Sequence, residues 1–588
     1  MRILSRLFSS LRFSSIVYPQ RIMTEHIVTA MTDGAKSDGV KTGGIRDGHV
    51  VRVAGLAVLA SLGSFFYYLQ RGDILVHGDA VAHINIARRV FDSTTPGLLQ
   101  LGTVWLPLPH LLMVPFLFPN KMWQSGMGGS IPSMIAYVFG VVGIHRLVRG
   151  VLKSDSRTQP AAEVGAWVAA FAYGANPNLI YMQATALTET LYLAFFIWAM
   201  VYFTEFLRGQ QLREDGPASN EAQRALRQCA CCVACAEMTR YDGWFLAGVI
   251  GATIVVIAAR QWENRTLRQS AVKFLFAIAV APVLWLVYNH AVYGNALEFA
   301  NGPYSAKAIE QRVGAPNPAL HNFWVAILYF VKSAQATLAV GNWGRFWLLV
   351  AILASLLALW IFRGKVAALL VLLWAPVAFY AYSIAYGSVP LHVPMWWPFA
   401  VFNFRFGVEL LPLFAVSAGL LLAATVACLG QGHVWKLAAV VGVLIVTSYA
   451  FVLKAQPLCW VEASRSWAMR RGLDTSVERV IKELPPNSRF LMDLGTHVGI
   501  MERLGIPLRR VVNSEDHRPW KRPADHEGIW EHALADPGRY VNYVIAFEGD
   551  SVDRAVNRTN LTLLAVIHSW GQPPARIYAT QHPPNQSR

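Results

Sequence analysis

Charged residues are scarce in this sequence. Only 15% of its 588 residues are Asp, Glu, Lys or Arg, and 54% are hydrophobic, whereas soluble domains carry about 25% charge. This composition excludes a disordered regulator, a coiled coil and a soluble chain of several domains. The long apolar runs require a lipid bilayer around most of the chain. We therefore expect a polytopic α-helical membrane protein.

Cysteine is also rare, and four of the six cysteines crowd into one segment at Cys229, Cys231, Cys232 and Cys235. Such spacing suggests a metal site. However, small apolar residues fill the gaps and no histidine lies near, so packing at a helix interface is the better interpretation. The other two cysteines lie far apart in the chain, which excludes a secreted disulfide scaffold.

Basic residues outnumber acidic ones by 51 to 35, a net charge of +16. In a soluble protein this excess would indicate nucleic acid, but in a membrane protein it gathers in cytoplasmic loops. The basic groups at 146–157, 208–227, 260–268 and 363–365 fall on one side of the membrane if the N-terminus is cytoplasmic. The sequence therefore predicts no nucleic-acid partner, a cytoplasmic N-terminus and an outer C-terminus.

About eleven apolar stretches are predicted to cross the membrane as helices. They lie at roughly 51–70, 130–148, 161–181, 188–206, 228–240, 243–259, 271–292, 345–362, 366–386, 407–428 and 436–453. The proline-rich stretch 104–119 and the stretch 321–340 are predicted to be interfacial or re-entrant on the outer face.

Three regions follow from this topology. Residues 1–50 are expected to form a disordered cytoplasmic tail, and 51–454 a transmembrane domain with an outer loop at 71–129. In residues 455–588, short apolar runs alternate with polar turns, which indicates an extracytoplasmic α/β domain. Since no organelle signal is convincing, we expect a bacterial plasma membrane, with this domain periplasmic or extracellular.

The first outer loop is the most informative segment for chemistry. Asp79 and His83 are four residues apart and share one face of a helix, and Arg88 and Arg89 follow. A carboxylate can take a proton or hold a metal, and arginine binds phosphate oxygens in pairs. The alternative is an amphipathic helix whose arginines meet lipid headgroups.

Other ionisable residues fall on the same predicted face. Glu189 opens a hydrophobic span, where an ionisable group is a functional candidate because its desolvation is costly. Arg240 and Asp242 form a polar break between two apolar runs, and they would alternatively pair only with each other. Arg405 enters a late helix, where it would clamp a phosphate. One further outer segment adds a tyrosine and a lysine, Tyr304 and Lys307, although its aromatics also fit an interfacial belt.

Five segments, in order along the chain, resemble the GT-C superfamily of glycosyltransferases. The narrower resemblance is to glycosyltransferase family 39 and the protein mannosyltransferases. The segments are Gly78-Asp79 through Arg88-Arg89, Gly102 through His110, Leu187 through Leu191, Thr239 through Gly243, and Arg405-Phe406-Gly407 with Leu410-Leu411-Pro412. One departure is Ala80, which stands where many relatives carry a second acid, and it leaves metal binding open.

The resemblance implies a GT-C-like fold and inverting transfer of a sugar, of the hexosyltransferase type. The donor would be a polyprenyl-phosphate sugar, and the acceptor a protein, a lipid or a glycan. The catalytic candidates would be Asp79, as general base, and Glu189. Arg240 and Arg405 would stabilise the leaving phosphate, and Glu189 and the substrate-binding candidate His83 would orient acceptor or donor or hold a divalent cation. Asp79 and His83 would be the ligands of a divalent cation if one takes part. The remaining substrate-binding candidates are Arg88, Arg89, Asp242, Tyr304 and Lys307.

A transporter or flippase of a lipid-linked or anionic substrate is the main alternative. That function predicts ionisable residues and broken helices near the bilayer midplane. The polar candidates here gather at one predicted interface, which favours an enzyme that works at the membrane surface.

Overall fold

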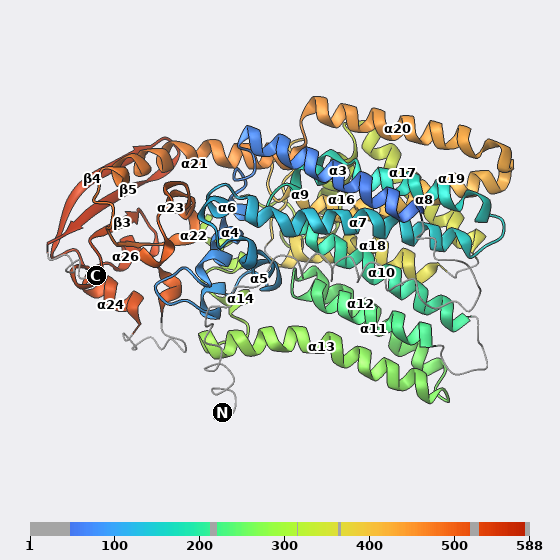
Figure 1. The fold of residues 1–588 in the computed structure, drawn as a ribbon, viewed down its shortest axis with the longest axis horizontal. Helices are drawn as coiled ribbons and strands as arrows, with labels where there is room; N and C mark the ends of the chain where they lie inside the picture. The colour runs from blue at the N-terminus through green and yellow to red at the C-terminus, as the bar shows by residue number, and fades with distance from the viewer. Residues whose placement is uncertain are drawn as a thin grey trace. The chain divides into compact units, whose positions relative to one another are not determined.

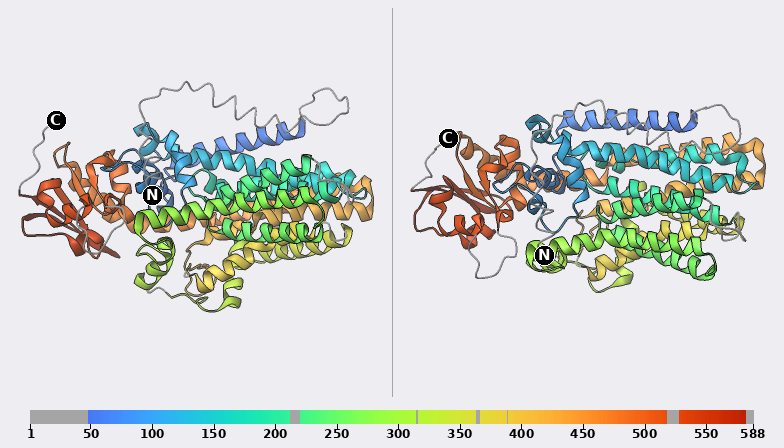
Figure 2. Two further views of the ribbon diagram at one scale, coloured as in Figure 1. Left: turned by 90° about the horizontal axis from the view of Figure 1, so that it is seen from below. Right: turned by 60° about the horizontal axis from the view of Figure 1, so that its bottom comes forward.

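The structure is a computed structural model, and it describes residues 48–211, 220–313, 316–362, 366–387, 389–517 and 528–581. The predicted tail at 1–50 lies outside the described residues except for its last three. The described residues from Val53 onward form one compact unit. Within that unit, long helices run side by side and the strands gather at one end of them (Figures 1 and 2).

The first half of the described chain is helical. Its longer helices are α3 (Gly48–Arg71), α4 (Gly78–Arg89), α7 (Met127–Lys153), α8 (Ala162–Gly174), α9 (Pro177–Gln183), α10 (Glu189–Gln211), α11 (Asn220–Glu237), α12 (Asp242–Arg260) and α13 (Arg265–Tyr293). Short helices complete the loop after α4, namely η2 (Leu98–Leu101), α5 (Leu108–Met113), η3 (Val114–Phe116) and α6 (Asn120–Gln124), and η4 (Gln159–Ala161) precedes α8.

The second half continues the bundle and ends in a mixed region. Its bundle helices are α14 (Glu298–Asn301), α15 (Ala306–Val313), α16 (Phe323–Leu338), α17 (Asn342–Ile361), α18 (Ala367–Tyr386), η5 (Phe404–Leu410), α19 (Leu411–Leu429), η6 (Gln431–His433) and α20 (Val434–Ala455). The C-terminal helices are α21 (Leu458–Lys482), α22 (Leu494–His497), α23 (Gly499–Leu504), η7 (Leu508–Arg510), η8 (Ser514–Asp516), α24 (Ile529–Ala535), α25 (Pro537–Tyr540) and α26 (Ser551–Ala555).

Nine helical segments among the described residues are long and apolar enough to cross a membrane. They coincide with nine of the eleven predicted spans. The predicted span at 161–181 is broken into α8 and α9, because Asn176 and Pro177 start a new helix there. The span at 228–240 falls on the end of α11, whose first half is polar. The count of eleven therefore stays a prediction.

The two segments that were predicted not to cross are short helices in the structure. Residues 104–119 form α5 and η3, as their prolines require. Residues 321–340 form α16, whose 16 residues span roughly 24 Å, less than the roughly 30 Å of a hydrocarbon core. Helix α16 packs against α17, α18 and η5.

A five-stranded sheet in the order β2-β1-β3-β5-β4 forms the C-terminal end of the unit. The strands are β1 (Phe490–Met492), β2 (Val511–Val512), β3 (Tyr543–Phe547), β4 (Leu561–Ser569) and β5 (Gln572–Thr580). Strand β1 is parallel to β2 and β3, whereas β5 is antiparallel to β3 and β4. All three residues of β1 are buried, as expected of a central parallel strand. The mixed α/β character predicted for this region is confirmed.

The sheet region is bound to the loop that carries α4. Asn85 Nδ2 donates to Glu502 Oε2 at 2.7 Å, and both side chains are buried. Further along the loop, Thr95 Oγ1 donates to Asp516 Oδ1 at 2.6 Å. These contacts join residues more than 400 positions apart, so the C-terminal region fixes the place of α4.

Candidate active site

Arg405 is the centre of a buried charged cluster at the end of the bundle nearest the sheet. Its Nη2 donates to Asp79 Oδ2 at 2.5 Å, and its Nε donates to Glu189 Oε1 at 2.7 Å. Its Nη1 lies 3.2 Å from His77 Nε2 and 3.4 Å from Glu462 Oε1. One guanidinium therefore joins three carboxylates from three helices.

Arg240 extends this cluster as a second guanidinium. Its Nη1 donates to Glu189 Oε1 at 3.0 Å, so that Glu189 bridges the two arginines. Its Nε donates to Asp242 Oδ2 at 3.2 Å, and its Nη2 bonds the Tyr380 hydroxyl at 3.0 Å. The same hydroxyl donates to Asp242 at 2.7 Å. Arg240 and Asp242 thus pair with each other and also belong to the larger cluster.

Helix starts bring these residues together. Asp79 lies in the first turn of α4, and Glu189 and Asp242 are the first residues of α10 and α12. A carboxylate is stabilised at a helix N-terminus by the helix dipole. Arg405 lies in η5, directly before α19. Four separate helix entrances therefore converge on one charged site.

Asp79 is the accessible acid of the cluster. Its side chain is 36% exposed, whereas that of Glu189 is 2% exposed. Burial opposes ionisation of Asp79, but the nearby Arg405 and histidines outweigh it and lower its pKa to about 2. Burial lowers the pKa of His77 to about 4, and Arg405 adds to this shift. At neutral pH the site therefore presents an ionised carboxylate beside a neutral imidazole.

His83 lies one helical turn after Asp79 and has partners of its own. Its Nδ1 lies 2.9 Å from His110 Nε2, and its ring lies 4.5 Å from that of Trp105. Burial lowers the pKa of His83 to about 4. The predicted proline-rich segment at 104–119 therefore contributes to this site through Trp105 and His110.

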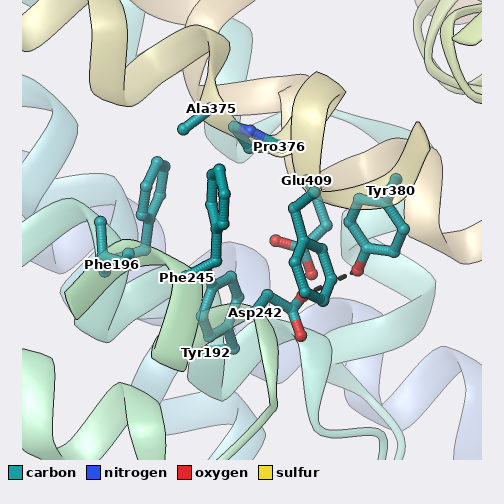
Figure 3. A pocket seen from close by; sticks show the side chains of 10 residues that line it. Tyr192, Phe196, Asp242, Phe245, Ala375, Pro376, Tyr380 and Glu409 are labelled. Atoms are coloured by element: carbon teal, nitrogen blue, oxygen red, sulfur yellow. Dashed lines mark hydrogen bonds between the residues drawn. The ribbon is translucent and has the colours of Figure 1, made fainter. Parts of the chain in front are cut away.

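A small pocket borders the cluster on its apolar side (Figure 3). Asp242 and Glu409 line one part of it, and the hydrogen bond from Tyr380 to Asp242 is visible there. The rest of the wall is aromatic or aliphatic, with Phe196 and Phe245 facing the acids across the pocket. The pocket thus joins apolar walls to the acidic side of the cluster.

Four of the predicted substrate-binding residues lie elsewhere. Arg88 donates to Asp92 at 2.8 Å and to the carbonyl of Leu117, and Arg89 donates to the carbonyl of Gln100 at 3.3 Å. These contacts hold the loop that carries α4. The other two, Tyr304 and Lys307, belong to the exposed segment of α14 and α15.

Three residues of the cluster, namely His77, Tyr380 and Glu462, were not among the sequence candidates. His77 is two positions from Asp79, and it caps α4, so its position in the loop was a usable signal. Glu462 lies in α21, where no motif marks it. It accepts from the backbone N–H groups of Asn403 at 2.6 Å and Phe404 at 3.0 Å. These two bonds fix the start of η5, and with it Arg405.

The suggested ligands of a divalent cation already have other partners. Asp79 Oδ2 accepts from Arg405, and His83 Nδ1 is bonded to His110. Among the residues that the structure describes, no group of three His, Cys, Asp or Glu side chains is placed to hold a metal ion. These donors do not fit a cation site, and we derive no step through a metal.

Comparison with known proteins gives the following picture. No protein-family model and no curated protein sequence matches this chain. The structure is similar to ArnT from Cupriavidus metallidurans bound to undecaprenyl phosphate, at 14% identity and a TM-score of 0.49, over 91% of this chain and 98% of that one. It is also similar to the Archaeoglobus fulgidus oligosaccharyltransferase in the apo form, at 11% identity and a TM-score of 0.47, over 92% and 76%. ArnT and this oligosaccharyltransferase are membrane glycosyltransferases of the GT-C superfamily.

Proposed function

We propose that this protein is a membrane glycosyltransferase that moves a sugar from a polyprenyl-phosphate donor to an acceptor hydroxyl, with Asp79 as general base. One observation carries the proposal: Arg405 joins an accessible carboxylate, Asp79, to a buried one, Glu189. General base catalysis needs an ionised acid that can reach the substrate. Among the acids that Arg405 contacts, Asp79 is the exposed one.

The proposed reaction is a single displacement. Asp79 takes the proton of the acceptor hydroxyl while its oxygen attacks the anomeric carbon of the donor. The bond from that carbon to the phosphate oxygen breaks, and the phosphate keeps the electron pair, so that the sugar configuration inverts. Arg240 and Arg405 stabilise the charge that grows on the leaving phosphate.

The contacts of Arg405 support a link between donor binding and the base. Four of its five N–H donors have partners, so a phosphate that binds two donors must displace one of them. Asp79 is the most exposed of these partners, and it is the one we expect to give way. Release from Arg405 raises the proton affinity of Asp79, because the guanidinium that stabilised its carboxylate then pairs with the phosphate. The base would thus become effective once the donor is bound.

The apolar pocket beside Asp242 supports the proposal that the donor carries a lipid chain. Its walls are formed largely by apolar side chains, with Phe196, Phe245 and Phe379 among them. The cavity itself is small, about 10 Å³, so these side chains must move apart before the first prenyl unit can lie beside a phosphate at the arginines. The donor would then lie with its charged group in the cluster and its tail toward the membrane.

The test uses purified protein in detergent and a panel of radiolabelled polyprenyl-phosphate sugars, with extracted membranes as a source of acceptor. We expect release of polyprenyl phosphate from one donor. The matched measurement places the same donors inside sealed proteoliposomes. Movement of the intact donor across the bilayer without release of its sugar would instead establish the transporter.

A further inference from the structure

A third guanidinium stands at the edge of the cluster, on a helix that the family motifs do not cover. Arg470 lies in α21, and its guanidinium packs against the backbone of Gly78. A methyl group on Gly78 would lie 3.1 Å from Nη2 of Arg470 and 3.4 Å from Nη1. Arg470 is therefore next to Asp79, the residue that follows Gly78.

Arg470 differs from Arg240 and Arg405 in its partners. Each of those two is bonded to carboxylates, whereas Arg470 forms no ion pair with any residue that the structure describes. Its Nε lies 3.4 Å from the carbonyl of Ser466, and its Nη2 lies 3.5 Å from the carbonyl of Val76. Both bonds are long, and the donors on Nη1 have no acceptor within the described chain.

The half-buried position of the Arg470 guanidinium favours binding of an anion. Its desolvation is compensated by two long bonds to carbonyls and by the charges of Asp474 and Asp79, neither of which forms an ion pair with it. The N-terminal end of α4 adds a positive dipole beside it, which disfavours a second positive charge. A phosphate offers two oxygens in the geometry that the guanidinium fork matches.

We infer that Arg470 binds a phosphate oxygen of the substrate and is the first cation that the phosphate meets. This inference rests on the proposed function, which supplies a phosphate-bearing substrate. Arg240 and Arg405 must each give up a partner before they can bind an anion with two donors, but both donors on Nη1 of Arg470 are available. The phosphate is held by Arg470 on one side, and it displaces Asp79 from Arg405 on the other.

The experiment measures binding of three probes in detergent: a polyprenyl monophosphate, the matching polyprenol without phosphate, and inorganic phosphate as competitor. Arg470→Gln removes the charge, and Arg470→Lys keeps it without the fork. Arg471→Gln is the matched control, because Arg471 is the next residue on α21 and is exposed. A thermal unfolding curve for each variant verifies the fold.

We expect Arg470→Gln to weaken binding of the polyprenyl monophosphate by about ten- to a hundredfold and to leave binding of the polyprenol unchanged. Arg470→Lys should bind the monophosphate with an affinity between those of the wild type and Arg470→Gln, and Arg471→Gln should bind as the wild type does. Competition by inorganic phosphate in the wild type would identify a bare phosphate as the ligand. Failure to compete, with the loss in Arg470→Gln intact, would identify the lipid-borne phosphate.

Two outcomes overturn the inference. If Arg470→Gln binds the monophosphate as the wild type does, or loses both lipids equally, Arg470 is not a phosphate ligand and the proposed function stands. If the wild type itself does not prefer the monophosphate over the polyprenol, the proposed function fails and the inference fails with it.

Discussion

Glu462 offers a sharp test of how the site is held together. Its two oxygens serve three donors, namely the backbone N–H groups of Asn403 and Phe404 and the guanidinium of Arg405. Glu462→Gln keeps the size of the side chain but leaves one acceptor oxygen, so one buried N–H group then faces an amide NH₂. A hydrogen bond to a charged group contributes about 1.5–3 kcal/mol. We expect the variant to lose about 3 kcal/mol, because the remaining bond to its oxygen also weakens.

Thermal unfolding in detergent, followed by tryptophan fluorescence, measures this loss. Glu483→Gln is the matched control, since Glu483 lies just after α21 and is exposed. We expect a midpoint several degrees lower for Glu462→Gln and an unchanged midpoint for the control. Equal midpoints for the two variants would refute the conclusion that Glu462 anchors the start of η5.

Two further predictions concern the loop that carries α4. Burial raises the pKa of Glu502 to about 8 from an ordinary value of 4.5. The folded protein then keeps a proton that the unfolded chain has lost, so wild-type stability should fall as pH rises from about 4.5 to 8. Glu502→Gln should remove this slope from the melting profile, and a flat wild-type profile would contradict the expectation. Arg88→Leu removes the guanidinium that binds Asp92 and lies 4.8 Å from the Trp123 ring. Breaking a buried pair costs about 3–5 kcal/mol, so size-exclusion chromatography should show a loss of folded protein, and a normal yield with normal melting would argue against a structural role.

The sequence predicts much of the site because its acids and arginines open helices. A polar break meets an apolar run at Asp79, Glu189 and Asp242. The basic residues of the loops indicate that these three breaks lie on the same side of the membrane. The helical period also brings Asp79 and His83 to one face. The polar breaks and the helical period are local patterns. They are enough to predict the position of residues that lie at the start of a helix.

Other members of the site have no local signal. Glu462 acts on residues nearly sixty positions earlier in the chain, and Arg470 packs against Gly78, which lies about 390 positions earlier. Only tertiary packing brings α21 to them. Arg88 lies on the same helix as Asp79, but its guanidinium is bonded to Asp92 and to backbone carbonyls. The sequence offers no means to predict these bonds. The sheet is a similar case, because β2 has only two residues and leaves no pattern to detect.

The most direct test of the central claim is sugar transfer by Asp79→Asn. The asparagine keeps the shape of the side chain but cannot take the acceptor proton. Asp536→Asn, an exposed change in the C-terminal region, is the matched control. With the donor that the wild type consumes, the account predicts a loss of at least about 100-fold in transfer, with an unchanged melting midpoint or a small shift and full activity in the control. Transfer at the wild-type rate by folded Asp79→Asn would contradict the account.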